Sequence, residues 1–136
     1  MTPKVDKILS VFLWLVAVHS FLVGIGLIVL PTSVFEFLGY QSTFDRFFST
    51  QGGVFHIVMA VGYAMAGYDT KRFECLIIFS IIVKLIATVF LIIYFIIISS
   101  QLLIILSGIS DFMMGLVILF LYKKLKLEAF FKIGAL

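Results

Sequence analysis

The sequence predicts an all-α protein, a bundle of four transmembrane helices, and two observations lead to this fold class. Hydrophobic residues make up 63% of the 136 residues and charged residues only 12%, with a mean hydropathy of +1.27. A soluble domain of this length could not bury so much apolar surface. The second observation is that the apolar residues gather in four runs, each of roughly the length that crosses a bilayer. The lipid bilayer is therefore the expected partner of most of the surface.

The four runs cover residues 8–30, 50–67, 75–98 and 102–122. About 20 apolar residues cross ~30 Å of hydrocarbon in a helix, which fits these lengths. The first run follows Lys4 and Lys7 as in a secretory signal, but it is longer than the apolar part of a signal, so it is expected to be retained. Only three residues separate the last two runs, which predicts an antiparallel hairpin. The chain is expected to form a single domain, 1–136, with a short basic tail at 123–136.

The connection between the first two runs, residues 32–49, begins after Pro31 and mixes charged residues with aromatic ones. It contains five phenylalanines, at positions 35, 37, 44, 47 and 48. Aromatic side chains favour the boundary between lipid and water. This connection is expected to lie on the membrane surface.

The positions of the basic residues predict the orientation. Eight Lys or Arg residues flank the runs on the side of the two termini, and only Arg46 lies on the opposite side. Cytoplasmic flanks carry an excess of Lys and Arg, so both termini are expected in the cytoplasm. The net charge of +3 and pI of about 9.1 are explained in the same way. Nucleic acid is therefore not an expected partner, and the single cysteine, Cys75, excludes an internal disulfide.

Four ionisable residues fall within the apolar runs: His19, His56, Lys84 and Asp111. Each lies about 10 to 12 residues from the cytoplasmic end of its run, or roughly 15 to 18 Å deep at helical rise. Such residues are costly in a membrane and are functional-site candidates by default. The four are expected in nearly one layer.

Spacing places polar or small residues on the same helix faces as these four. Ser80, Lys84 and Thr88 recur at every fourth position of the third run, and Ser107, Asp111 and Gly115 do so in the fourth. The second run has a similar small and polar stripe that includes His56 and Tyr63 and would allow close helix packing. Gln51 falls on another face and is expected at the outer mouth, with Asp45 and Arg46.

Lys84 and Asp111 are expected to meet across the hairpin, and two interpretations of this pair stay open. It is either a structural ion pair or the centre of a polar pocket for a headgroup, an anion, a quinone or a proton. His19 and His56 form interhelical hydrogen bonds, act as a proton-linked switch, or ligate a b-type haem. Tyr63 is either core packing or part of the pocket, and the sequence requires no cofactor.

The sequence contains no nucleotide-binding glycine motif and no hydrolase elbow, which favours a non-enzymatic role. The leading hypothesis is a membrane protein that binds or passes a small polar or amphipathic ligand at the midplane cluster. One alternative is a redox accessory subunit that uses haem or quinone. Another is a structural partner of a second membrane protein or of a further copy of the chain.

The order of several residues resembles a family of small bacterial four-helix membrane proteins called DoxX-like. The resemblance covers about residues 24–111 and rests on Pro31, Phe35, Gly39, Gln51-Gly52-Gly53, Gly62-Tyr63, Ala66, Asp69, Arg72, Lys84 and Asp111. Val83 and Leu85 stand where the family usually has glycines, and Ser110 stands where asparagine is common. The resemblance implies a location in a bacterial cytoplasmic (inner) membrane and implies that Lys84 and Asp111 are recurrent features. It also implies a link to quinone or thiol redox systems for some members.

Overall fold

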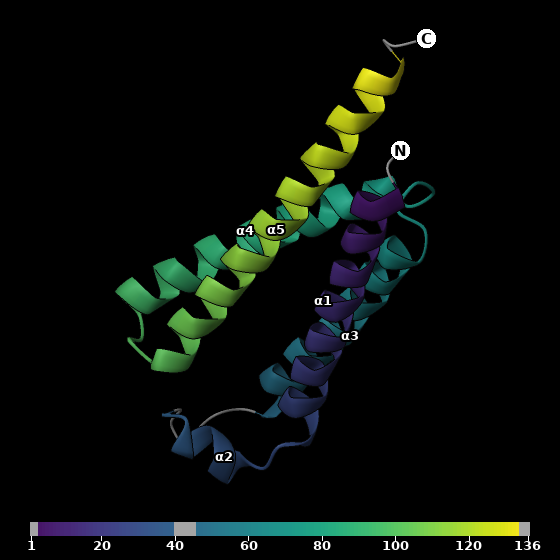
Figure 1. Ribbon diagram of the computed structural model, residues 1–136. Helices are drawn as coiled ribbons and strands as arrows, with labels where there is room; N and C mark the ends of the chain where they lie inside the picture. The colour runs from purple at the N-terminus through teal and green to yellow at the C-terminus, as the bar shows by residue number, and fades with distance from the viewer. Residues whose placement is uncertain (1–2, 40–45, 134–136) are drawn as a thin grey trace.

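The computed structural model describes residues 3–39 and 46–133, and this part of the chain is helical without any strand (Figure 1). The helices are α1 (Pro3–Val29), α2 (Thr32–Phe37), α3 (Arg46–Tyr68), α4 (Glu74–Ile97) and α5 (Leu102–Ile133). The predicted all-α class is confirmed. The short α2 lies in the phenylalanine-rich connection, where it buries Phe35 and leaves Phe37 89% exposed.

Three helices in the described residues are long and apolar enough to cross a membrane, over Lys4–Val29, Glu74–Ile97 and Leu102–Phe130. They indicate an integral membrane protein. Helix α3, with 23 residues, is comparable in length to α4 but less apolar. Gln51, His56, Tyr63 and several glycines lower its hydropathy. Three of the four predicted spans are therefore supported by length and composition, and the span over α3 stays a prediction.

The long helices form two antiparallel pairs, α1 with α3 and α4 with α5, and the pairs cross at an angle (Figure 1). The start of α1, the turn after α3 and the distal part of α5 lie at one end of the molecule, here called the basic end. Helix α2 and the α4–α5 loop lie at the other. Gln101 of that loop donates a hydrogen bond from Nε2 to the carbonyl oxygen of Gly39 at 2.6 Å. The chain thus reverses direction at each of its connections.

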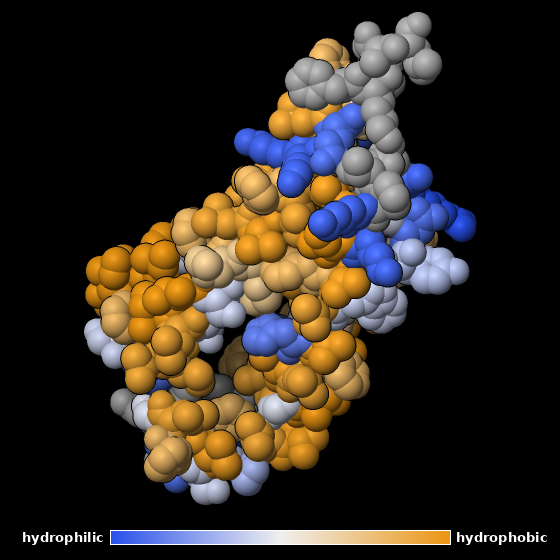
Figure 2. Space-filling view, in the orientation of Figure 1, coloured by the Kyte–Doolittle hydropathy of each residue, from blue (hydrophilic) through white to orange (hydrophobic). Residues whose placement is uncertain are grey.

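The buried core lies toward the basic end, where α1 and α3 meet α4 and α5. Its most enclosed apolar side chains are Leu9, Leu13, Val16, Tyr63, Ile77 and Ile118. Large apolar side chains also cover much of the outer surface, whereas hydrophilic ones gather near the basic end (Figure 2). This distribution suits a protein whose surroundings are hydrocarbon rather than water.

Helices α1 and α3 approach closely at Gly24 and Gly53. A Cβ atom on Gly24 would lie 2.7 Å from the carbonyl oxygen of Gly53, and one on Gly53 would lie 2.6 Å from that of Gly24. Only glycine permits such an approach, and small residues are typical of helix interfaces in membranes. At the basic end Ser10 donates a hydrogen bond to the carbonyl oxygen of Gly67 at 2.5 Å.

Helix α5 extends beyond the predicted boundary. The fourth apolar run ends at residue 122, whereas α5 continues to Ile133, through most of the segment expected as a tail. Residues 123–133 contain no glycine or proline, and eight of the eleven are Lys, Leu, Glu or Ala, which favour helix. Lys126 Nζ and Tyr122 Oη also each lie 2.5 Å from Glu74 Oε1, so α5 is attached to the start of α4 there.

Candidate functional site

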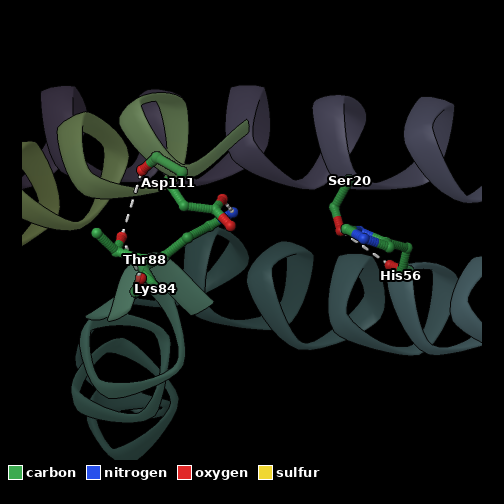
Figure 3. A network of polar contacts seen from close by, with 6 residues as sticks. Ser20, His56, Lys84, Thr88 and Asp111 are labelled. Carbon is green, nitrogen blue, oxygen red and sulfur yellow. Dashed lines mark hydrogen bonds and ion pairs between the residues drawn. The ribbon is translucent and has the colours of Figure 1, made fainter. Parts of the chain in front are cut away.

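The ion pair between Lys84 and Asp111 is the centre of the candidate site (Figure 3). Lys84 Nζ lies 2.5 Å from Asp111 Oδ1, and the two residues come from α4 and α5. The lysine side chain is 5% exposed and the aspartate side chain 16% exposed. The predicted pairing across the hairpin is confirmed. Because the charges cancel, the pair can stay inside an apolar bundle.

Small and polar neighbours make room for this pair on both helices. Thr88 Oγ1 donates to the carbonyl oxygen of Lys84 at 2.8 Å and lies 3.5 Å from that of Gly108 on α5. A Cβ on Gly115 would lie 3.1 Å from the Cβ of Lys84, closer than most such contacts. Ser80 is buried and donates within its own helix, to the carbonyl oxygen of Leu76. Lys84 and Thr88 of the first predicted stripe thus face α5, and Asp111 and Gly115 of the second face α4.

Tyr63 connects the ion pair to the other half of the molecule. Its side chain comes from α3, is 2% exposed, and presents its ring to Lys84 with Nζ 5.5 Å from the ring centroid. A cation over an aromatic face is attracted by the ring quadrupole, more strongly where water is excluded. Two interpretations of Tyr63 were open, core packing and a place in the pocket. The structure places its side chain in the core and also against Lys84.

His56 belongs to a second set of contacts. Ser20 Oγ on α1 donates to the backbone carbonyl oxygen of His56 at 2.9 Å and lies 3.3 Å from its Nδ1 (Figure 3). The predicted interhelical hydrogen bond of this histidine is confirmed. His56 precedes Tyr63 by two helical turns, or about 10 Å along α3. The structure thus divides the predicted layer into two sets of contacts.

His19 and Gln51 are not brought to the ion pair. His19 is exposed on α1, and its direction differs by about 100° from that of Ser20, which faces α3. The two imidazoles therefore do not face one another across the α1–α3 interface, as a haem with two histidine ligands would need. Among the described residues no group of three or more His, Cys, Asp or Glu is arranged to hold a metal ion.

Gln51 is exposed near the start of α3, and its placement at an outer mouth stays a prediction. Asp45, expected beside it, lies outside the described residues. Arg46 binds the C-terminal end of α1, where it donates to the carbonyl oxygens of Ile28, at 2.8 Å, and Leu30. Such contacts satisfy carbonyl groups that a helix end leaves without partners.

Sequence reasoning missed two contributors to the site. Gly108 contacts α4, since a Cβ there would lie 3.3 Å from the Cβ of Leu91, and its carbonyl faces Thr88. Its position three residues before Asp111 is the signal that could have placed it on the same face. Ser20, the partner of His56, sits beside His19 in the sequence but points in another direction.

The chain matches no protein-family model, no curated protein and no solved structure. The resemblance to DoxX-like proteins accordingly stays a prediction.

Proposed function

We propose that the chain is a four-span membrane protein that binds a small polar or amphipathic ligand at the Lys84–Asp111 pair. The single observation that carries this proposal is that the two charged side chains of the pair differ in their exposure. The lysine is enclosed, whereas the aspartate keeps 16% of its side-chain surface open. Around a purely structural pair in a bilayer, we would expect neighbouring side chains to enclose both charged groups. The surroundings there offer little to compensate a charge that stays exposed.

The site also holds more hydrogen-bonding capacity than the chain itself uses. Among the described residues, Lys84 Nζ has one hydrogen-bond acceptor, Asp111 Oδ1, although an ammonium carries three N–H donors. Within that part of the chain, Asp111 Oδ2 and the hydroxyl of Tyr63 have no hydrogen-bond partner. A ligand with both donor and acceptor atoms would satisfy these groups.

The charge balance at the pair favours an uncharged or zwitterionic ligand. One ammonium and one carboxylate sum to zero, so a net ion would enter an apolar bundle without an opposite charge. A carbonyl or hydroxyl group on an apolar body fits better, since it can accept from Lys84 and leave its remainder among apolar side chains. A quinone ring belongs to this class, and the DoxX-like resemblance, with its link to quinone systems, is consistent with it.

The proposal is tested by a mass-spectrometric comparison of small molecules that co-purify in detergent. The wild type is compared with the double variant Lys84→Met/Asp111→Asn, which removes both charges and leaves neither unpaired. His19→Gln is the matched control, because it alters another polar residue within the apolar runs that is exposed and is not brought to the pair. We expect one molecule that is enriched with wild type and the control and at least about tenfold depleted with the double variant. Equal amounts in all three would contradict the proposal.

The four-span topology with cytoplasmic termini is part of the proposal and has its own test. Reporters fused after Leu136 and inserted at Thr70 are expected to be cytoplasmic, and one inserted at Ser99 is expected on the opposite side. The alternating helix directions support this arrangement, because Asp6 accepts a hydrogen bond from Thr70 across the basic end. A reporter at Thr70 on the outer side would exclude α3 as a span.

A further inference from the structure

Three hollows follow one another along the α1–α3 interface, and neighbouring hollows share Trp14 and Ala64 or Tyr68 in their linings. The lining residues follow every third or fourth position of the two antiparallel helices. On α1 they are Lys7, Ser10, Trp14, Ala17, Val18 and Phe21, and on α3 they are Ile57, Val61, Ala64 and Tyr68. We call this feature the α1–α3 groove.

The inner part of the groove is apolar and about 290 Å³ in volume. Ala17, Ala60 and Ala64 form its floor, because their small side chains leave space between the larger Trp14 and Phe21. Trp14 is 46% exposed along its wall. Such a surface would be covered by hydrocarbon in a bilayer.

Toward the basic end the same groove becomes polar. Trp14, Ala64 and Tyr68 line the next hollow together with Arg72, and Tyr68 also borders a hollow of about 390 Å³. This outer hollow is lined by polar groups of α1 and of the turn after α3: Asp6, Lys7, Ser10, Asp69, Thr70 and Lys71. The lining thus changes from apolar to charged residues toward the expected level of the lipid headgroups.

The two carboxylates of the outer hollow are already engaged by the chain. Asp69 Oδ1 accepts from the backbone N–H groups of Lys71, at 3.1 Å, and Arg72, at 3.0 Å, and Asp6 accepts from Thr70. In the described part of the chain neither Lys7 nor Lys71 forms an ion pair, and both are exposed. In formal charge the two lysines balance the two carboxylates, and Arg72 of the adjoining hollow adds one positive charge. The carboxylate oxygens are engaged by hydrogen bonds whereas the ammonium groups are not, so the lysines can donate to a phosphate group.

The length of the groove matches one leaflet. From Lys7 to Phe21 the rise along α1 is about 21 Å, and one leaflet including its headgroup region is ~20–22 Å thick. A headgroup at Lys7 would therefore leave its acyl chain beside Trp14 and extending to Phe21.

We propose that the α1–α3 groove binds one phospholipid, with its phosphate at Lys7 and Lys71 and an acyl chain along Trp14. The occupant is a lipid of the leaflet at the basic end. This site is separate from the Lys84–Asp111 pair, and the proposal does not depend on the ligand proposed there.

Trp14 provides the test, because it is the single tryptophan of the chain. Its fluorescence is measured for the whole protein in maltoside micelles, during titration with phosphatidylglycerol that carries brominated acyl chains. Diacylglycerol with the same brominated chains is the comparison lipid, since it lacks the phosphate. We expect quenching to saturate, with half-quenching at a roughly tenfold lower mole fraction of the phospholipid, as two lysine contacts to an anionic headgroup imply.

Two double variants with equal charge changes distinguish this site from general attraction to the basic end. Lys7→Gln/Lys71→Gln removes the proposed phosphate contacts, and Lys123→Gln/Lys124→Gln alters exposed lysines of α5 outside the groove. In the first variant, the two lipids are expected to quench Trp14 fluorescence at equal mole fractions. In the second variant, the phospholipid is expected to keep its lower half-quenching mole fraction. No preference in the wild type, a preference kept by the first variant, or a preference lost from both variants would each overturn the proposal.

Discussion

The α1–α3 pair and the α4–α5 pair are held together by different interactions. Helices α1 and α3 pack backbone against backbone at Gly24 and Gly53. Helices α4 and α5 instead meet through a buried ion pair between Lys84 and Asp111. Both pairs are antiparallel and both present apolar side chains outward, so the difference lies in their interfaces (Figures 1 and 2).

This difference follows from what the bilayer supplies as a solvent. Lipid tails are as apolar as leucine, so burying apolar side chains gives little drive for helix association. Close packing and polar contacts must replace that drive. The first pair combines close packing with hydrogen bonds from Ser10 and Ser20, whereas the second adds to its glycine contacts a charge pair that retains free hydrogen-bonding capacity. We therefore expect α1–α3 to act as a rigid frame and α4–α5 to carry the site.

The largest effects are expected at the ion pair. Lys84→Met or Asp111→Asn alone leaves one buried charge without its partner, which should lower the free energy of unfolding by about 3–5 kcal/mol if the site stays dry. The double variant should lose less than the sum, because the remaining charge disappears with its partner. Unfolding in detergent, followed by circular dichroism, measures all three. Strictly additive losses would contradict an energetic link between the two residues.

A smaller loss is expected at the close approach of α1 and α3. Gly53→Ala places a Cβ against the backbone of Gly24, which should cost about 1–3 kcal/mol. Gly62→Ala is the matched control on the same helix, since nothing lies within 4 Å of its Cβ position. The control should be neutral or stabilising by up to about 1 kcal/mol, because alanine favours helix over glycine. Equal melting temperatures for the two variants would show that α1–α3 does not depend on this contact.

The smallest of these effects is expected at the hydrogen bonds between Ser20 and His56. Ser20→Ala removes the hydroxyl and should lower the free energy of unfolding by about 0.6 kcal/mol, a usual value for polar contacts between membrane helices. Ser100→Ala, at an exposed position in the α4–α5 loop, should change it by less than about 0.5 kcal/mol. Chemical unfolding of both variants measures the difference. If Ser20→Ala lowered the free energy of unfolding more than Gly53→Ala does, this polar contact would be the main interaction between α1 and α3.

Much of the α4–α5 pair could be predicted from local sequence. The repeat of Ser80, Lys84 and Thr88 at four-residue intervals defines one helix face, and the short loop requires the next helix to pack against it. The depth of Asp111 then identifies the partner of Lys84. The extent of α5 was harder to predict, because the predicted end rested on hydropathy, whereas the helix continues through residues that favour helix without being apolar.

The placement of α3 could not be predicted in the same way. Tyr63 and His56 share a small and polar stripe in the sequence, yet one side chain contacts Lys84 and the other contacts Ser20. Which of the two side chains reaches the ion pair depends on the position along α3 at which α4 and α5 cross it. That distance is set by the crossing of the two helix pairs, which leaves no local signal in the chain.

The sequence by itself predicted a helical protein with four membrane spans, three of which the helices support by length and apolarity, and an acidic partner for Lys84. These properties follow from composition, periodicity and the cost of an unpaired charge in hydrocarbon. Only the tertiary structure decided that Tyr63 covers the lysine, that His19 stays exposed, and that a groove follows α1 past Trp14. Those arrangements depend on how helices distant in the chain pack, and packing is a property of shapes in contact rather than of any one segment.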